Sequence, residues 1–286
     1  MKLRDADLNE LCDLAVLAAS KAALRISETD PASLSVDRKA GAVSLAAAVV
    51  SQLDRDAQEI ILSVLQESVG HFDLALLAEE SEDSRERFEK DYFWCIDPLD
   101  GTLPFLEGKP GYAVSIALVS REGLPMLGVV VDPLTGNRLQ AIRGGGAYLN
   151  GGAFRVGERK GPLNLFTDRS MMTHPLFDLC VNRLGAVHVH EPAGAVMNVC
   201  NMLKHEPACY FKFPKAELGG GSLWDYAATA CIIREAGGVV TDLHGGPLDL
   251  NRSDATFMNH RGFLFATDVH LHERVGELLR DISLER

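Results

Sequence analysis

Apolar residues recur every three to four positions in two stretches near the start of the chain. The first stretch, from Leu8 to Ile26, predicts an amphipathic helix. The second, from Ser51 to Gln66, predicts another helix, and Asp54 lies one residue from its apolar row. The segment between them, Glu28 to Ala42, contains proline and glycine and predicts a loop.

Short apolar runs bounded by turn residues come next, and they predict strands. The charged run Ser81 to Asp91 predicts a solvated loop or hairpin, and the glycine-rich run Gly144 to Gly152 predicts a hairpin. Pro98 is expected to end the strand before it, because proline donates no backbone hydrogen bond. Strands joined by hairpin turns predict a largely antiparallel sheet. The predicted strands are Phe72 to Ala78, Tyr92 to Ile96, Ala113 to Ser120, Met126 to Val131 and Arg138 to Ile142.

The composition turns polar near Gly157 to Pro162, where we place a boundary between two lobes, residues 1–158 and 159–286. Beyond it, strands and helices are predicted to alternate, which is typical of helices packed on a sheet. The expected strands are Leu163 to Thr167, Ala186 to Val189, Ala208 to Phe213, Gly238 to Thr241 and Phe263 to Ala266, and the expected helices are Pro175 to Leu184, Gly194 to Lys204, Trp224 to Ala236 and Val269 to Leu279.

Two carboxylates follow the predicted strand that begins at Tyr92. Asp97 and Asp100 need cations, hydrogen bonds or water if they are buried at a strand end. Together with the Leu99 carbonyl, they could direct hard oxygen atoms to one point, as Mg²⁺ prefers. Asp, Pro and Gly are also ordinary turn residues, so a solvated turn is the alternative interpretation.

The charge of the chain limits its partners. A formal net charge of −12 argues against a surface that binds nucleic acid or an anionic membrane. The same charge would repel a phosphate substrate, unless a bound divalent metal offsets it. We therefore expect a small-molecule partner, with no nucleic-acid polymer and no membrane.

The six cysteines show no Cys-x-x-Cys spacing, and three of them lie inside apolar runs. This pattern predicts free, mostly buried thiols in a reducing compartment, and we expect a cytoplasmic protein. The charged residues Met1 to Asp5 lead into the first helix and do not resemble a signal peptide. No uncharged apolar stretch is long enough to suggest a membrane span.

Further carboxylates lie at the ends of other predicted elements. Glu79 and Glu80 follow an apolar strand, and Asp225 begins an Ala-rich helix directly after Trp224. Asp225 alone could be a helix cap. All three motifs together, in this order, would arise by chance much more rarely than any one of them alone.

These motifs carry a resemblance to a known family. The chain resembles the inositol monophosphatase family, within the magnesium-dependent, lithium-sensitive phosphatase superfamily, and the likeness covers nearly its whole length. The resemblance implies an α/β (α+β) fold, the layered αβαβα sandwich of the inositol monophosphatase and fructose-1,6-bisphosphatase type. The matching segments are Ala78 to Ser81, Asp97 to Thr102, Trp224 to Ala228 and Glu235 to Asp242.

The resemblance also implies a site with two or three Mg²⁺ ions and a homodimeric assembly. Asp54 and Thr102, with Glu79, would orient the attacking water, and Gly101 and Thr102 would bind the phosphate through their backbone N–H groups. The implied metal ligands are Glu79, Asp97, the Leu99 carbonyl, Asp100 and Asp225, and Asp100 and Asp225 are also expected to contact the substrate.

The substrate is less clearly indicated than the chemistry. We expect its variable wall at Gly194-Ala195, where the family often has Gly-Ser, and at Lys215 to Ser222. Lys215 is a candidate for binding a second phosphate, and Glu217 is a candidate for binding polyol hydroxyls. Both could instead be solvated loop charges.

The leading hypothesis is a Mg²⁺-dependent phosphomonoesterase that hydrolyses a small phosphorylated metabolite, in the manner of inositol-1-monophosphatase. The alternative within that class is a 3′(2′),5′-bisphosphate nucleotidase acting on 3′-phosphoadenosine 5′-phosphate. It is suggested by the segments Cys209 to Pro214 and Asp242 to Leu248. A hypothesis of another class is a catalytically silent protein that binds metal or phosphate.

Overall fold

The computed structural model describes the backbone of residues 2–30, 42–185 and 187–284. The predicted loop from Glu28 to Ala42 therefore lies mostly outside the described residues, as does Ala186, the expected first residue of one strand.

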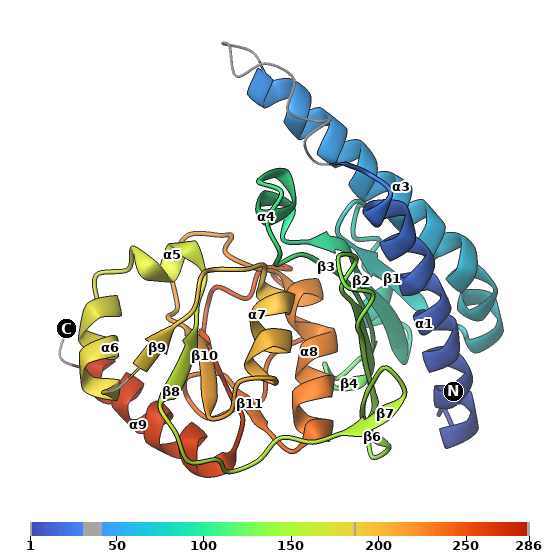
Figure 1. Ribbon diagram of the computed structural model, residues 1–286. Coiled ribbons are helices and arrows are strands. Elements are labelled where there is room, and N and C mark those ends of the chain that lie inside the picture. Colours follow the sequence, from blue (N-terminus) through green and yellow to red (C-terminus); the bar gives the residue numbers. More distant parts are fainter. Residues whose placement is uncertain (1, 31–41, 186, 285–286) are drawn as a thin grey trace.

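The protein is built of five layers, in the predicted αβαβα order (Figure 1). Helices α1 (Asp5–Ser27) and α3 (Ala42–Phe72) cover the outer face of a seven-stranded sheet. Helices α7 (Ala195–Met202) and α8 (Leu223–Ala236) lie between this sheet and a five-stranded one. Helices α6 (Phe177–Leu184) and α9 (Val269–Leu284) cover the far face of the five-stranded sheet.

The seven-stranded sheet follows the order of the chain. Only the first two strands are parallel, and every other neighbouring pair is antiparallel, so the prediction of a largely antiparallel sheet is confirmed. The glycine-rich run predicted to form one hairpin contains the turns of two, between β5 and β6 and between β6 and β7. Its strands are β1 (Ala75–Ala78), β2 (Tyr92–Asp100), β3 (Ala113–Ser120), β4 (Pro125–Val131), β5 (Arg138–Ile142), β6 (Gly146–Leu149) and β7 (Gly152–Phe154).

Alternation along β2 decides which of its residues reach the middle of the molecule. Trp94 and Ile96 pack among residues of α1 and α3, whereas Phe93 and Cys95 pack among residues of α7 and α8. Successive side chains of a strand point to opposite faces. Asp97 therefore belongs to the inner face, toward α8.

The five-stranded sheet has the order β11-β12-β10-β8-β9. Strands β8, β9 and β10 are parallel to their neighbours in that group, and β12 runs antiparallel to both β10 and β11. The alternation predicted for the second half is confirmed. Its strands are β8 (Leu163–Phe166), β9 (Val187–Val189), β10 (Ala208–Lys212), β11 (Val239–Thr241) and β12 (Phe263–Ala266).

The prediction that Pro98 ends its strand is wrong, because β2 continues to Asp100. The pairing of β2 with β3 shifts register between Asp97 and Asp100, so Pro98 and Leu99 have no partner residue on β3. Pairing of β2 with β1 has already stopped at Ile96. A proline in a bulge does not interrupt a ladder of hydrogen bonds, since no donor is needed there.

Two boundaries near the start also differ from the prediction. Helix α3 extends to Phe72, and residues 72–74 do not belong to the following strand, which begins at Ala75. The run Ser81 to Asp91 is not wholly solvated, because it contains a short 3₁₀ helix, η1 (Glu86–Phe88), in which Arg87 is only 1% exposed. Arg87 forms an ion pair with Asp83 at 2.9 Å. The short helices α4 (Thr102–Leu106) and α5 (Arg169–Met172) had no counterpart in the prediction.

Helix α8 belongs to the second half of the chain but packs against β3 and β4 of the first sheet. The two halves therefore share the central layer. We keep the lobes 1–158 and 159–286 as a proposal for the division of the chain.

All six cysteines are buried and free, as predicted. Within the residues that the structure describes, no helix is both long enough and apolar enough to span a membrane.

Candidate metal centre

Three carboxylates from distant parts of the sequence meet at one edge of the seven-stranded sheet. Asp97 and Asp100 lie at the end of β2, and Asp225 lies in the first turn of α8. One carboxylate oxygen from each lies within 4.8 Å of the corresponding oxygens of the other two. The structure thus brings together three of the residues that the sequence motifs singled out.

Backbone groups fix Asp97 and Asp100. Oδ1 of Asp97 accepts a hydrogen bond from the Leu99 N–H at 3.0 Å, while its Oδ2 is buried and has no hydrogen-bond partner in the described part of the chain. Asp100 accepts hydrogen bonds from the N–H groups of Ala195 at 3.1 Å and Val196 at 2.9 Å, at the start of α7. Asp97 reaches the cluster through the alternation of side chains along β2, and the register shift after it lets Asp100 lie on the same side.

Asp225 reaches the cluster because of the way α8 begins. Ser222 is the N-cap, and Asp225 is the third helical residue of a capping box. One carboxylate oxygen of Asp225 accepts a hydrogen bond from the Ser222 N–H at 2.6 Å. The hydroxyl of Ser115 on β3 donates to the Trp224 carbonyl at 3.3 Å, which ties the helix start to the first sheet. Asp225 therefore stabilises its helix and also lies in the carboxylate cluster.

Glu79 and Asp54 extend the cluster toward α3. Glu79 follows β1, and the Gln58 side chain fixes the next residues, since it accepts from the Glu80 N–H at 3.0 Å and donates to the Ser81 hydroxyl at 2.8 Å. Asp54 lies one helical turn before Gln58, and its Oδ1 is buried without a hydrogen-bond partner among the described residues. Sequence reasoning missed Gln58, which gives no signal beyond its place on the helix.

The pKa values of these carboxyl groups reflect burial and mutual repulsion. Burial, and then the charges of Glu80 and Glu79, raise the pKa of Asp54 to about 7. Exclusion of water, and then the charge of Asp225, raise the pKa of Glu79 to about 7. The pKa values of Asp97, Asp100 and Asp225 are raised as well, with burial as the largest cause in each case. Such a set favours either protons or a cation.

The donor set fits a divalent cation with a preference for oxygen. It consists of carboxylate oxygens, which are hard ligands. One of the Asp97 oxygens is buried and has no hydrogen-bond partner among the described residues. An unpaired buried carboxylate oxygen is costly, and a metal ion would satisfy it. The residues placed to hold such an ion are Asp97, Asp100 and Asp225, with Glu79 beside them.

The turn after Asp100 is shaped by close backbone contacts. Gly101 has a φ of +84°, and a Cβ there would lie 2.4 Å from the Gly111 carbonyl oxygen. Thr102 is the first residue of α4, and its hydroxyl donates to the Leu99 carbonyl at 3.3 Å. Gly194 and Ala195 lie directly against Asp100. The predicted phosphate-binding and water-orienting residues are thus grouped around the carboxylates.

The remaining predicted residues lie in the loop before α8. Lys215 and Glu217 are both exposed, and their carbonyls accept hydrogen bonds from the Asn259 side chain at 3.1 and 2.9 Å. Sequence reasoning missed the pair that lies deeper, in which Lys212 contacts Asp168 at 2.7 Å. No local motif marks this pair, because Asp168 directly follows the predicted strand Leu163 to Thr167 whereas Lys212 lies inside the predicted strand Ala208 to Phe213.

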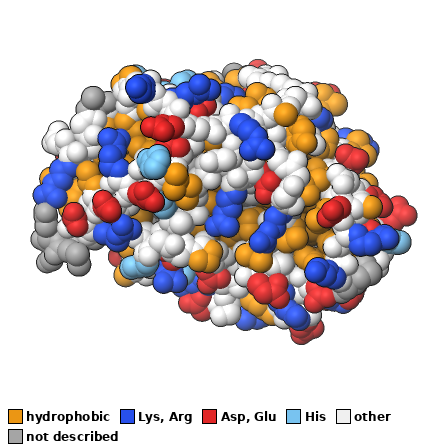
Figure 2. Space-filling model, turned by 90° about the horizontal axis from the view of Figure 1, so that it is seen from below, with side chains coloured by type: hydrophobic (Ala, Val, Ile, Leu, Met, Phe, Trp, Pro, Cys, Tyr) orange, Lys and Arg blue, Asp and Glu red, His pale blue; other side chains and the backbone are white. Residues whose placement is uncertain are grey.

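On the face shown in Figure 2, Lys and Arg side chains are scattered among Asp and Glu rather than gathered into one basic area.

The chain is similar to known proteins over most of its length. The sequence profile of the inositol monophosphatase family matches residues 7–283. Inositol monophosphatase 1 of Rattus norvegicus is 28% identical over 97% of this chain and 96% of its own length. Nus factor SuhB of Pasteurella multocida is 31% identical over 69% of this chain and 73% of its own.

A solved structure shows the same fold. The inositol monophosphatase from Anabaena (Nostoc) sp. PCC 7120 superposes with a TM-score of 0.71, covering 96% of this chain and 97% of that one, at 22% identity. The chain belongs to the inositol monophosphatase family.

Proposed function

We propose that the protein is a Mg²⁺-dependent phosphomonoesterase that hydrolyses a small phosphorylated metabolite, in the manner of inositol-1-monophosphatase. The observation that carries the proposal is the cluster of Asp97, Asp100 and Asp225, with its unpaired buried oxygen, in a member of this family. Phosphoryl transfer asks a protein mainly for positioning and charge neutralisation.

Two or three Mg²⁺ ions, when bound, would neutralise the phosphoryl oxygens and lower the pKa of coordinated water. Glu79, Asp97, the Leu99 carbonyl, Asp100 and Asp225 would hold them. The Thr102 hydroxyl donates to the Leu99 carbonyl, which leaves its oxygen free to accept a hydrogen bond from the attacking water. Asp54 and Glu79 are the carboxylates available to orient that water from the other side.

Backbone N–H groups are available to donate hydrogen bonds to the phosphoryl group of the substrate. Thr102 opens α4, and the N–H groups of a first helical turn have no intrahelical partner. We propose that Gly101 and Thr102 donate to the phosphoryl group, and that Gly194, Ala195, Lys215 and Glu217 border the part of the substrate that leaves.

A second candidate is a 3′(2′),5′-bisphosphate nucleotidase, and two neighbouring lysines favour it. The Nζ atoms of Lys212 and Lys215 lie 3.4 and 3.2 Å from the point where a Cβ on Gly220 would be. A catalytically silent binding protein is less well supported, because it would need neither Asp54 nor Thr102 beside its ligand.

The direct test is release of inorganic phosphate from a panel of esters, with and without Mg²⁺. The panel contains inositol 1-phosphate, 3′-phosphoadenosine 5′-phosphate, fructose 1,6-bisphosphate and histidinol phosphate. We expect turnover of at least one ester that disappears when Mg²⁺ is chelated. Binding of esters without release of phosphate from any of them would favour the silent protein.

Three further proposals rest on the family resemblance: a homodimer, inhibition by lithium, and a cytoplasmic location. Light scattering at micromolar concentration should give twice the mass of the chain, and a monomer would contradict the first. Li⁺ added to the phosphate-release assay tests the second, and fractionation of the source cells tests the third.

A further inference from the structure

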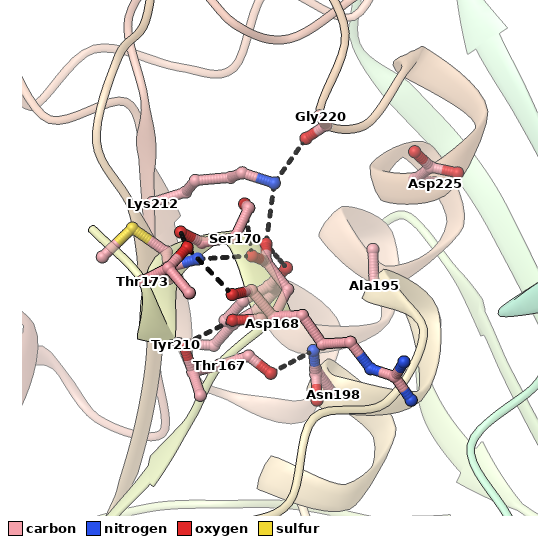
Figure 3. Close-up of polar contacts among 12 residues, drawn as sticks. Thr167, Asp168, Ser170, Thr173, Ala195, Asn198, Tyr210, Lys212, Gly220 and Asp225 are labelled. Atoms are coloured by element: carbon pink, nitrogen blue, oxygen red, sulfur yellow. Dashed lines mark hydrogen bonds and ion pairs between the residues drawn. The ribbon is translucent and has the colours of Figure 1, made fainter. Parts of the chain in front are cut away.

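The ammonium group of Lys212 lies between the Gly220 carbonyl and the Asp168 carboxylate, on the second half of the chain, which also carries Asp225 (Figure 3). Its ammonium group donates to the Gly220 carbonyl at 2.6 Å, in the loop that ends at the cap of α8. It also pairs with the Asp168 carboxylate at 2.7 Å, at the end of β8. Both partners are fixed by the fold, so the ammonium group has a defined place.

The Asp168 side of this arrangement is rigid. Oδ1 of Asp168 accepts from the Ser170 hydroxyl at 2.6 Å and from the Met171 N–H at 2.9 Å. The preceding carbonyl, that of Thr167, accepts from the Asn198 side chain at 2.9 Å, and Asn198 belongs to the helix whose first N–H groups hold Asp100. Asp168 is thus joined to the same helix end that positions Asp100.

The Gly220 side is rigid as well. A Cβ on Gly221 would lie 2.3 Å from the Tyr226 hydroxyl, so the loop lies directly on α8. The Asn259 side chain holds the carbonyls of Lys215 and Glu217. An ammonium group held between two such supports loses little conformational freedom when it binds a substrate.

The charges at this place are unlike those of the metal centre. A lysine ammonium has three donors, and fixed acceptors occupy two of them in Lys212. Lys215 adds a second positive charge near Gly220, whereas the Asp168 carboxylate is already engaged by four donors. The Lys212 ammonium group therefore keeps one donor free, whereas the Asp168 carboxylate beside it is already engaged.

A neutral polyol and an anionic group would be bound differently by such a wall. Polyol hydroxyls need acceptors as well as donors, whereas a phosphate or carboxylate needs donors and positive charge. We propose that Lys212 selects the substrate in this site, and that it favours a phosphate ester whose leaving alcohol carries a second anionic group. This inference rests on the phosphomonoesterase function proposed above.

The test uses two pairs of esters that differ by one phosphate. They are adenosine 3′-phosphate with adenosine 3′,5′-bisphosphate, and inositol 1-phosphate with inositol 1,4-bisphosphate. For each protein, kcat/KM is measured at a Mg²⁺ concentration that saturates that protein, because a lysine near the carboxylates also affects the Mg²⁺ requirement. The quantity compared is the ratio of kcat/KM for the bisphosphate to that for the monophosphate.

The wild type is expected to prefer the bisphosphate in at least one pair. Lys212→Gln should lower that ratio by roughly ten- to a hundredfold, mainly through KM, because it removes one charge-assisted contact. Lys212→Arg keeps the charge and should retain more of the preference. The matched control is Lys21→Gln, which removes an exposed charge on α1, beyond the opposite face of the first sheet, and should leave the ratio unchanged.

Each other outcome has a distinct meaning. A ratio that changes by less than about threefold in Lys212→Gln, in protein whose far-UV spectrum and melting temperature match the wild type, overturns the proposal, even if Lys215→Gln lowers the ratio. If the wild type hydrolyses both members of each pair equally well, this inference is overturned, but the phosphomonoesterase function is not. A wild type that hydrolyses none of the four esters contradicts the phosphomonoesterase function and this inference together.

Discussion

Gly194 lies so close to Asp100 that a Cβ on Gly194 would be 2.3 Å from the carboxylate Oδ2. The same carboxylate is held by the next two N–H groups, of Ala195 and Val196. The start of α7 therefore determines where Asp100 points.

Gly194→Ala should displace Asp100 and impair metal binding. Overpacking of this kind typically costs roughly 1–3 kcal/mol of stability. We expect a lower melting temperature and a higher Mg²⁺ concentration for half-maximal activity. Gly157→Ala is the control, because a Cβ there meets nothing within 4 Å and its φ is not positive. Equal behaviour of the two variants would show that Asp100 does not depend on this contact.

Asp97→Asn should impair metal binding while leaving the fold intact. Asp97 is 1% exposed, and burial and then the neighbouring carboxylates raise its pKa, so removing its ionisable group should raise the melting temperature of the metal-free protein. Loss of a residue that only supports a metal ligand typically costs about 10- to 100-fold in activity. Loss of a ligand itself should cost more, so phosphate release should fall by at least about 100-fold. Asp13→Asn, an exposed site on α1, serves as the charge-matched control. Full turnover by Asp97→Asn at ordinary Mg²⁺ would refute its assignment as a metal ligand.

Thr102→Ala tests the orientation of water. If the hydroxyl acts mainly in the transition state, kcat should fall by roughly 10²–10⁴-fold while KM changes little. Thr102→Ser keeps the oxygen that bonds the Leu99 carbonyl and should recover most of the activity. A loss of less than about threefold in the alanine variant would leave Thr102 as a turn residue only.

The stability of the metal-free protein should fall as pH rises from about 5.5 to about 8. Asp54 and Glu79 have folded-state pKa values of about 7, whereas their ordinary values are 3.8 and 4.5. In this window the folded state binds more protons than the unfolded state, so the free energy of unfolding decreases with pH. Asp7, Glu107 and Asp254 have the opposite effect, because their folded-state pKa values are lowered to about 2, but their ordinary values of 3.8 and 4.5 confine that effect to more acidic pH.

The measurement is thermal unfolding at pH 5.5 and pH 8, in chelator and in saturating Mg²⁺. Without metal, the melting temperature should be lower at pH 8. Mg²⁺ should raise it more at pH 8 than at pH 5.5, because metal competes with protons for the same oxygens. A metal-free protein that becomes more stable between pH 5.5 and pH 8 would contradict this account.

The sequence predicted the strands best where one apolar run ended at clear turn residues. The bounds of β3, β5 and β12 agree with the prediction residue for residue, because turn residues or a change of polarity mark each end. Pro98 misled the prediction for a physical reason. A missing backbone N–H matters only where a partner strand would accept its hydrogen bond. At Pro98 a register shift in the pairing with β3 removes that need.

The proposed metal ligands could be identified from sequence because each motif is local, but the Lys212–Asp168 pair could not be found in the same way. The two residues are far apart in the chain and meet because β8 and β10 are parallel neighbours, with Tyr210 opposite Phe166. Continuing that register by two residues places Lys212 opposite Asp168. Strand order, which periodicity does not give, is the information that was missing.

The position of α8 has a consequence for synthesis of the chain on the ribosome. Gly128 on β4 approaches α8 so closely that a Cβ there would lie 2.3 Å from the Ala228 carbonyl oxygen. The strands of the first sheet are translated well before α8, and N-terminal regions generally fold first as they emerge. The apolar inner face around Phe93 and Cys95 therefore stays uncovered until residue 236 has left the exit tunnel, and a nascent chain arrested before that point should bind chaperones and be prone to proteolysis.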